Sequence, residues 1–480
     1  MSKNILKIAK NALTSNYLIG ASSIYIFSSF LLKGVNFITT PIFTRIMSQK
    51  EYGNVSSAVM LTSFIAIFIC CQVASSINTA KVDFEKRKFK AFVHHISIFS
   101  ILSFLVLGAL VLVFSKYITN FVALDQVLII PILLSALGTN FVSIYSCFLI
   151  ALKKPKKKAI FSIVFSLSVV LISLTAVIIV DSKKDYARII GMSFVEFLTF
   201  IVILFLIKKE DRTVFNKDEF NFNIKYALAI SLPLIFHLFA NLINSQADRI
   251  FIIRLMDSSS LALYSVAYSL GMVFMAFVDA FFMAWTPWYY EKTKNAENKK
   301  VVSACKITFV AIALLFSAII LLSPELLAVV APSSYSSAQS CVVAIAFGVF
   351  FQALYKFPTS YEVYKKNTKY VAMATVVTGG INIGLNFILI PSFGILGAAI
   401  STALSYITLF LLHDIVARNI IGEYNIPQST YIIPIIIICV ASIVGFLYGN
   451  FVLIRIIILA VLCSVFGCYC YYRYKSIKLA

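Results

Sequence analysis

The sequence predicts an all-α protein that crosses a membrane about 14 times, and three observations lead to this fold class. Of the 480 residues, 60% are hydrophobic and only 13% are charged, whereas soluble domains carry roughly 25% charged residues. Apolar stretches of about 20 residues, the length of one helical span, follow one another with short polar connections. The Lys and Arg residues are concentrated in alternate connections, which is typical of a polytopic membrane protein.

The first span is expected to remain in the mature chain. Lys3, Lys7 and Lys10 precede it, as in a signal peptide, but the apolar run continues to about Phe43 without a small-x-small cleavage site. Backbone groups in lipid must be satisfied within the protein, so spans of this length are helices rather than barrel strands. We place the spans at 18–43, 55–78, 91–114, 127–150, 159–180, 187–207, 226–246, 262–288, 303–322, 338–358, 370–390, 394–416, 431–448 and 452–472.

The basic connections predict the orientation of the chain. Lys and Arg cluster at 81–90, 153–158, 208–217, 292–300 and 365–369. With a cytoplasmic N-terminus, the cytoplasmic segments hold about 30 of the 41 Lys and Arg residues, and the even number of spans places both termini in the cytoplasm. A net charge of +21 also suits a nucleic-acid-binding protein. Because the bases flank apolar spans, we expect membrane lipids as partners and no nucleic acid.

No motif in the sequence points to catalysis or to a cofactor. The nine cysteines lie in or at the ends of apolar stretches, without metal-ligand or disulfide spacing, and are expected to be packing residues. Neither a nucleophile–His–acid arrangement nor a phosphate-binding glycine loop is visible. We therefore expect a protein that is not an enzyme and has neither metal nor cofactor.

A weak internal repeat runs through the chain. Thr44–Ser48 (TRIMS) matches Ile253–Asp257 (IRLMD) at an offset of 209, and Ala151–Lys157 (ALKKPKK) matches Val363–Lys369 (VYKKNTK) at an offset of 212. A third match, between glycines that begin two spans, has an offset of 206. Three matches near one offset indicate a duplicated unit.

The duplication predicts two halves of six spans each. The halves are 1–207 and 226–416, joined by a cytoplasmic linker at 208–225 and followed by two additional spans at 417–480. Because six is even, both halves have the same orientation, and the symmetry axis runs along the membrane normal. A parallel repeat of this kind predicts a central cavity between the halves, as in alternating-access transporters.

Several motifs resemble a known family, and the resemblance extends over the whole chain. They are NIGLNFILIPSFGILGAAISTALSYI (Asn382–Ile407), TRIMSQKEYG (Thr44–Gly53), ADRIFI (Ala247–Ile252) and AWTPWYYEK (Ala284–Lys292). These runs look like those of the polysaccharide transporters within the multidrug/oligosaccharidyl-lipid/polysaccharide (MOP) exporter superfamily. From the residues alone, the small residues Gly394 and Gly397 favour close helix packing, and Pro391 is expected to end span eleven. The motif need not touch the substrate.

The resemblance implies a Wzx-type O-antigen flippase with a MATE-like fold. Such a protein moves undecaprenyl-pyrophosphate-linked oligosaccharide units from the inner to the outer leaflet of the bacterial cytoplasmic membrane, with a polymerase and chain-length proteins as pathway partners. Two other functions are open: a cation-coupled multidrug exporter of the same superfamily, and a membrane-embedded glycan polymerase or ligase. A drug exporter is expected to have an acidic cavity and twelve spans. The polymerases and ligases typically have a large external loop, which this chain lacks.

Basic residues at membrane depth are the candidates for binding the pyrophosphate, because charges inside a membrane are costly and usually functional. Lys33 is the first candidate, since it lies about ten residues from either end of its span, too deep for easy snorkelling. Arg249 and Arg45, at outer helix ends, are candidates to draw the headgroup outward. The alternative is an ordinary interfacial ion pair of Arg249 with Asp248. Lys356 is a further candidate for binding the pyrophosphate. The alternative is that its side chain only snorkels to the inner interface.

Acidic and polar residues within the spans are the candidates for ion coupling and sugar binding. Asp279, followed by Glu196, is a candidate H⁺ or Na⁺ site, since burial favours the protonated carboxyl. The alternative for Asp279 is a fixed counter-ion for Lys33 or Lys356. Asn241 and Asn244, at the polar end of span seven, are candidates to bind sugar hydroxyls or a neighbouring helix. His237 suits proton transfer, or a hydrogen bond to a neighbour.

Overall fold

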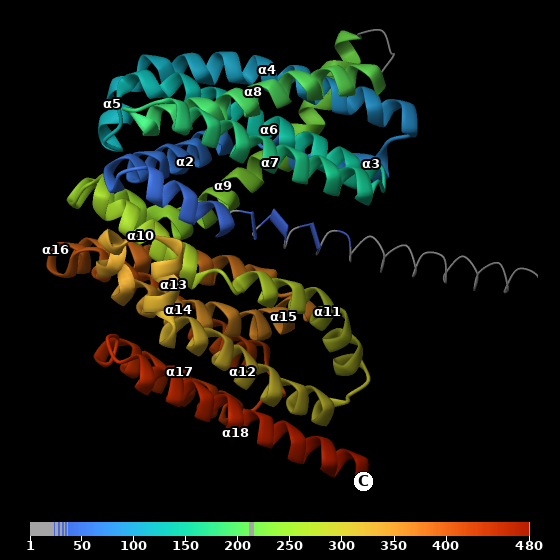
Figure 1. Cartoon of the computed structure of the whole chain (residues 1–480). Helices are drawn as coiled ribbons and strands as arrows, with labels where there is room; N and C mark the ends of the chain where they lie inside the picture. The colour runs from blue at the N-terminus through green and yellow to red at the C-terminus, as the bar shows by residue number, and fades with distance from the viewer. Residues whose placement is uncertain are drawn as a thin grey trace, which may run out of the picture. The chain divides into compact units, whose positions relative to one another are not determined.

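The computed structural model describes residues 24, 27, 28, 31, 32, 34, 35, 37–210 and 216–479, with the side chains of all of these except 237, 240, 244 and 468–479. Every regular element in this part of the chain is a helix (Figure 1), which confirms the all-α class. The contacts divide the chain into two compact units, Met1–Thr39 with Ser57–Phe239 and Thr40–Ser56 with Ala240–Ala480. The halves expected from the repeat stay a prediction.

The first unit consists of long helices joined by short ones. Within it, α6 packs against α3, α4 and α8, and α7 packs against α8 (Figure 1). Its elements are α2 (Gln49–Ile69), η1 (Val73–Ser76), α3 (Ile77–Asp83), α4 (Lys86–Val113), α5 (Ser115–Phe121), η2 (Gln126–Leu128), α6 (Ile129–Ala151), α7 (Pro155–Ile179), α8 (Lys184–Glu210) and α9 (Lys217–Leu255), of which α2 and α9 continue into the second unit.

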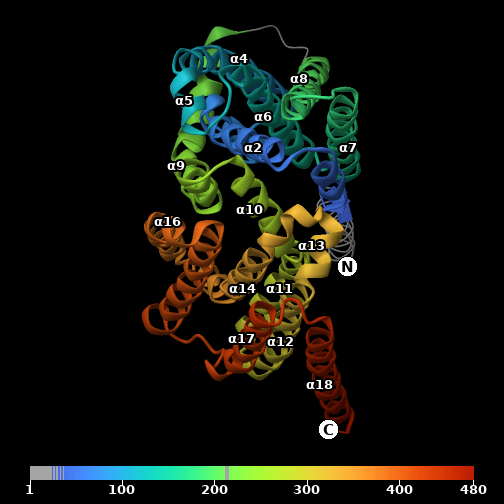
Figure 2. The ribbon, with the colours of Figure 1, turned by 60° about the vertical axis from the view of Figure 1, so that its left-hand side comes forward.

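The second unit also consists of long helices joined by short ones. Here α14 packs against α10, α12 and α16, and α17 packs against α12 (Figure 2). Its elements are α10 (Ser258–Gly271), α11 (Met275–Lys294), α12 (Asn298–Leu321), α13 (Ser323–Val330), η3 (Ser333–Ala338), α14 (Gln339–Leu354), α15 (Lys356–Tyr364), α16 (Thr368–Ile415), the π-helix η4 (Val416–Ile421), α17 (Ser429–Leu447) and α18 (Val452–Leu479).

Eleven helical segments among the described residues are long and apolar enough to cross a membrane, and a shorter apolar helix covers Val452–Gly467. The longest segment, Thr368–Ile421, has 54 residues, about twice the length that one span needs, and contains two of the predicted spans. Nearly half of the first predicted span lies outside the described residues. The protein is a multi-pass membrane protein, while the expected number of 14 spans is not confirmed.

The second predicted span, 55–78, is not one continuous helix. α2 ends at Ile69, and both Cys71 and Gln72 have a φ of 50°. The Ser103 hydroxyl of α4 donates a hydrogen bond to the Ile69 carbonyl at 2.9 Å. A side chain thus satisfies a backbone acceptor at the break, as the absence of water in a membrane requires.

Gly394 divides α16 into two arms, with φ of 58° and ψ of −139°, a conformation that is open essentially to glycine alone. We expected Pro391 to end span eleven, but the helix continues past it. Proline removes a helical hydrogen bond, but its φ is fixed near −65°, so it cannot supply the reversal. The arms lie so close that a Cβ on Gly397 would overlap the Leu389 carbonyl. α16 is therefore a tight helical hairpin.

The order of elements recurs in the two units. A long helix, a short helix, a 3₁₀ turn and a second long helix follow one another as α4, α5, η2 and α6, and again as α12, α13, η3 and α14. Each unit also has a glycine at a close contact between two helices. A Cβ on Gly138 of α6 would lie 2.5 Å from the backbone carbonyl oxygen of Glu196 in α8, and a Cβ on Gly348 of α14 would lie 2.5 Å from the Cα of Ala403 in α16. These glycines are 210 residues apart, close to the offset of the repeat.

Candidate functional site

A buried carboxylate cluster in the second unit joins α9, α10 and both arms of α16. Asp248, in α9, is only 2% exposed. Its Oδ2 accepts hydrogen bonds from Tyr264 Oη and Thr402 Oγ1, each at 2.6 Å. Its Oδ1 accepts one from Asn386 Nδ2 at 2.6 Å, and Asn386 Nδ2 also donates to Asn382 Oδ1 at 3.0 Å. Three neutral side chains therefore hydrogen-bond one carboxylate.

The charge balance of this cluster decides its chemistry. Within the described part of the chain no Lys or Arg forms an ion pair with Asp248. The guanidinium of the neighbouring Arg249 lies 5.7 Å from the centre of the Tyr268 ring. A buried carboxylate without a counter-charge is costly in a membrane. Asn386 Oδ1 is also buried and has no hydrogen-bond partner among the described residues. Carboxylate, amide and hydroxyl oxygens suit a hard cation, and a proton on Asp248 would remove the same charge.

This cluster was not predicted from the sequence, in which Asp248 was considered only as an interfacial partner of the adjacent Arg249. One signal was present: Asn382 and Asn386 are four residues apart and therefore share one helix face in an apolar stretch. Thr402 lies in the same quoted motif. The carboxylate that these side chains contact is set by the tertiary structure.

Lys356 and Asp279 form an ion pair in the second unit. Lys356 Nζ lies 2.5 Å from Asp279 Oδ1, and the side chains are 23% and 46% exposed. The ammonium also lies 5.5 Å from the centre of the Phe282 ring. This contact agrees with the alternative in which Asp279 is a fixed counter-ion. An ion-coupling role for Asp279 and a substrate-binding role for Lys356 stay predictions.

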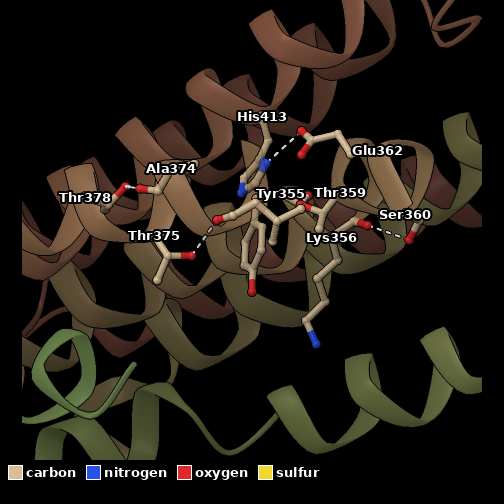
Figure 3. A network of polar contacts seen from close by, with 10 residues as sticks. Tyr355, Lys356, Thr359, Ser360, Glu362, Ala374, Thr375, Thr378 and His413 are labelled. Atoms are coloured by element: carbon tan, nitrogen blue, oxygen red, sulfur yellow. Dashed lines mark hydrogen bonds and ion pairs between the residues drawn. The ribbon is translucent and has the colours of Figure 1, made fainter. Parts of the chain in front are cut away.

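A hydrogen-bonded pair of His413 and Glu362 lies in the same unit and is fully buried. His413 Nδ1 lies 2.8 Å from Glu362 Oε1, and the side chains are 1% and 0% exposed. Figure 3 shows the Lys356 side chain pointing away from this pair. The Tyr355 ring stacks on His413 with the ring centres 5.5 Å apart. The pair connects α15 to the second arm of α16, and its partners are 51 residues apart, too far for a sequence pattern to indicate.

Glu196 lies in the first unit, on the face of α8 that contacts α6. It is 7% exposed and lies beside the hydroxyl side chain of Ser135 in α6. Its Oε2 is buried and has no hydrogen-bond partner in the part of the chain that the structure describes. Glu196 is thus a buried carboxyl with a neutral partner, in a unit other than that of Asp279, and its coupling role stays a prediction.

Arg45 binds backbone carbonyls at the end of α13. Its guanidinium donates hydrogen bonds to Ala328 O at 3.2 Å, Val329 O at 2.9 Å and Pro41 O at 3.0 Å. A positively charged side chain at a helix C-terminus stabilises the carbonyl groups that lack hydrogen-bond partners within the helix. This contact gives Arg45 a structural role, and its binding of substrate stays a prediction.

The remaining candidates lie along α9 or in the first predicted span. Arg249 is half-buried and Asn241 is exposed, both on α9. Lys33 lies outside the described residues, and so do the side chains of Asn244 and His237. The structure therefore brings Asp248 together with three polar partners, and pairs Lys356 with Asp279.

Comparison with known proteins adds sequence relatives. The model of a family described as "Polysaccharide biosynthesis protein" matches residues 19–292. "Lsg locus putative protein 1" of Haemophilus influenzae is 24% identical over 288 residues, which are 58% of this chain and 67% of that protein.

Two kinds of solved structure have a similar fold. Lipid II flippase MurJ, in an inward closed conformation, matches with a TM-score of 0.70 and 17% identity, over 96% of this chain and 99% of that one. An inward-facing MATE family multidrug resistance transporter of the MOP superfamily matches with a TM-score of 0.57 and 12% identity, over 86% of this chain and 99% of that one. At these identities the similarity concerns the fold.

Proposed function

Because the chain belongs to the polysaccharide biosynthesis protein family, we propose that it is a flippase for undecaprenyl-pyrophosphate-linked oligosaccharide units, such as O-antigen repeats. The family resemblance and the MOP-like fold expected from the sequence are confirmed. One observation carries the proposal: the family model matches more than half of the chain. In support, the fold is similar to that of a lipid II flippase over 96% of the chain. The cargo crosses the bacterial cytoplasmic membrane to its outer leaflet by alternating access, and both termini are cytoplasmic.

The proposed cargo requires two kinds of contact. Its pyrophosphate is strongly anionic, so basic groups at membrane depth lower the cost of transfer, and Lys33 and Arg249 are the candidates. Its sugar hydroxyls suit amide side chains, and Asn241 and Asn244 are candidates for these. A polymerase and chain-length proteins then act on the translocated unit.

For ion coupling we propose Asp248 in place of Asp279. A coupling carboxyl must exchange its neutralising ion, H⁺ or Na⁺, during the cycle. Asp279 already has the ammonium of Lys356 at 2.5 Å, whereas Asp248 is buried among hydroxyl and amide groups only. The unpartnered Asn386 Oδ1 supplies a further oxygen for a cation.

Reconstitution in proteoliposomes tests the function. The probe is a prenyl-diphosphate oligosaccharide with a fluorescent label on the sugar, and a membrane-impermeant quencher reports the leaflet. We expect protein-dependent movement of the probe and no transport of the cationic dye ethidium. Ethidium transport without movement of the lipid-linked probe would instead identify a multidrug exporter.

A further inference from the structure

A basic cavity lies at one end of the first unit, away from the residues considered so far. It has a volume of about 850 Å³ and is lined by residues of α4, α6, α7 and α8 and of the α6–α7 connection. These helices meet the cavity at the ends that the sequence predicts to be cytoplasmic. Its basic side chains are Lys86, Arg87, Lys90, Lys154, Lys157 and Lys209.

The described residues that line the cavity carry an excess of positive charge. Among them, Glu210 is the one acidic residue. It accepts a hydrogen bond from Lys90 at 2.5 Å, and its other oxygen lies 4.0 Å from Lys154 Nζ. Six cationic groups thus surround a single carboxylate, and a concave site with this excess of positive charge attracts anions.

The rest of the wall is apolar. Phe148 and Leu149 of α6 are buried, Leu206 of α8 is 37% exposed, and Tyr145 lies one turn before Phe148. A small soluble anion gains no binding energy from the apolar part of such a wall. A lipid gains binding energy from both parts, because its phosphate contacts the basic groups while the first carbons of its chains contact the apolar side chains. Basic pockets between helices on the cytoplasmic side of membrane proteins bind acidic lipid headgroups in this way.

We propose that this cavity binds the phosphate-bearing headgroup of a lipid at the cytoplasmic surface of the membrane. The inference does not depend on which cargo the protein moves. A membrane phospholipid and a prenyl diphosphate share the required chemistry, a phosphate attached to an apolar chain.

A matched pair of double variants tests the site. The cavity variant is Arg87→Gln with Lys157→Gln. The control is Lys88→Gln with Lys156→Gln, which removes the same charge from the same two helix ends at exposed residues that do not line the cavity. Purified full-length protein in neutral detergent is titrated with short-chain phosphatidic acid, farnesyl diphosphate, inorganic diphosphate and phosphatidylcholine.

We expect the cavity variant to bind phosphatidic acid or farnesyl diphosphate about 25-fold more weakly than the wild type, from about 1 kcal/mol per basic residue. The control is expected to stay within about twofold, because residues outside a site change binding little. Tighter binding of phosphatidic acid would identify a membrane phospholipid as the ligand, and tighter binding of farnesyl diphosphate would identify a prenyl diphosphate. Equal losses in both double variants would overturn the proposal in favour of general surface charge. Inorganic diphosphate binding as tightly as either lipid, or unchanged lipid binding in the cavity variant, would overturn it as well.

Discussion

Asp248 and Asp279 are both carboxylates of the second unit, but their partners differ. The charge of Asp279 is neutralised by the fixed ammonium of Lys356. Asp248 is held by hydroxyl and amide dipoles, which stabilise a charge only in part when it is removed from water. We therefore expect a mobile ion at Asp248 and not at Asp279.

Asp248→Asn tests this difference, because it keeps the shape of the side chain and removes its charge. We expect the flipping rate to fall about tenfold, equivalent to about 1.4 kcal/mol, and to stop responding to pH and Na⁺ gradients in proteoliposomes. Asp257→Asn is the control, since Asp257 caps α10 through the Ser260 amide at 2.7 Å and Asn caps helices as well as Asp does. A gradient response that survives in Asp248→Asn would contradict the coupling role.

A charge swap tests whether Lys356 and Asp279 act as a simple pair. Because both side chains are partly exposed, either Lys356→Asp or Asp279→Lys alone is expected to lower the free energy of unfolding by about 1 kcal/mol. The double variant is expected to restore both thermal stability and flipping. Restored stability without restored flipping would show that Lys356 or Asp279 contacts the cargo or a coupling ion.

The α16 hairpin shows how one residue sets the path of a whole element. Its arms supply Asn386 and Thr402, on either side of Gly394, to the same carboxylate. The reversal at Gly394 thus forms the Asp248 cluster as well as two spans. A straight helix would place these two residues about 24 Å apart at 1.5 Å per residue.

Gly394→Ala is expected to lower the free energy of unfolding by about 1–3 kcal/mol, because an L-residue is strained at this φ and ψ. Gly380→Ala is the control on the same helix. Its Cβ would have no neighbour within 4 Å, so we expect no loss or a gain of up to about 1 kcal/mol. Thermal unfolding of both variants in one detergent measures the difference, and equal stabilities would refute the hinge role of Gly394.

A second link between elements joins α18 to α13. Arg455 is 1% exposed and donates two hydrogen bonds to Glu325, at 2.6 and 2.7 Å. Arg455 lies at the start of the last predicted span, and the structure buries it in an ion pair. The hydrogen bonds from Arg455 hold the pKa of Glu325 below its usual value of 4.5.

This pKa predicts an acid-sensitive contact. A carboxylate with a lowered pKa in the folded state stabilises the protein above its unfolded pKa, and the contribution is lost as the pH falls through the folded pKa. Glu325→Gln is therefore expected to lower the unfolding temperature at neutral pH and to converge with the wild type well below pH 4.5. The exposed Glu85→Gln is the control. A constant difference between Glu325→Gln and the wild type across this pH range would contradict the assignment.

The two units repeat one order of helices, and this supports a duplication that the sequence motifs indicated faintly. The lysine connection at 153–158 follows α6, whereas the one at 365–369 follows α14 and the additional short helix α15. If both units have the orientation that the repeat predicts, both connections lie on one side of the membrane. The basic cavity of the first unit is expected on that side.

A reporter fusion tests this orientation. A fusion after Lys158 is expected to report the cytoplasm and one after Ser334 the outside, because basic connections remain inside. A fusion after Lys366 is expected to agree with the first. The reverse pattern would invalidate the span assignment and the proposed side of the cavity.

The fold was more predictable than the candidate site. Span positions depend on local composition, so the helices were found, whereas the break at Cys71 and Gln72 depends on side-chain contacts with a neighbouring helix. Of the charged candidates, Lys356 and Asp279 were correctly considered as partners. Asp248 was assigned to Arg249, because an adjacent charge is visible in a sequence and a hydroxyl 154 residues away is not.

Composition and charge order by themselves determined a many-span helical membrane protein and its predicted orientation, because insertion into lipid responds to each segment and its flanking charges in turn. The family resemblance came from sequence motifs. Only the tertiary structure decided which carboxylate is neutralised by a lysine and which is left with dipoles alone. That difference depends on contacts between helices distant in the chain. Contacts between helices of the first unit likewise gather basic residues from separate parts of the chain around one cavity, which we propose as a lipid-binding site.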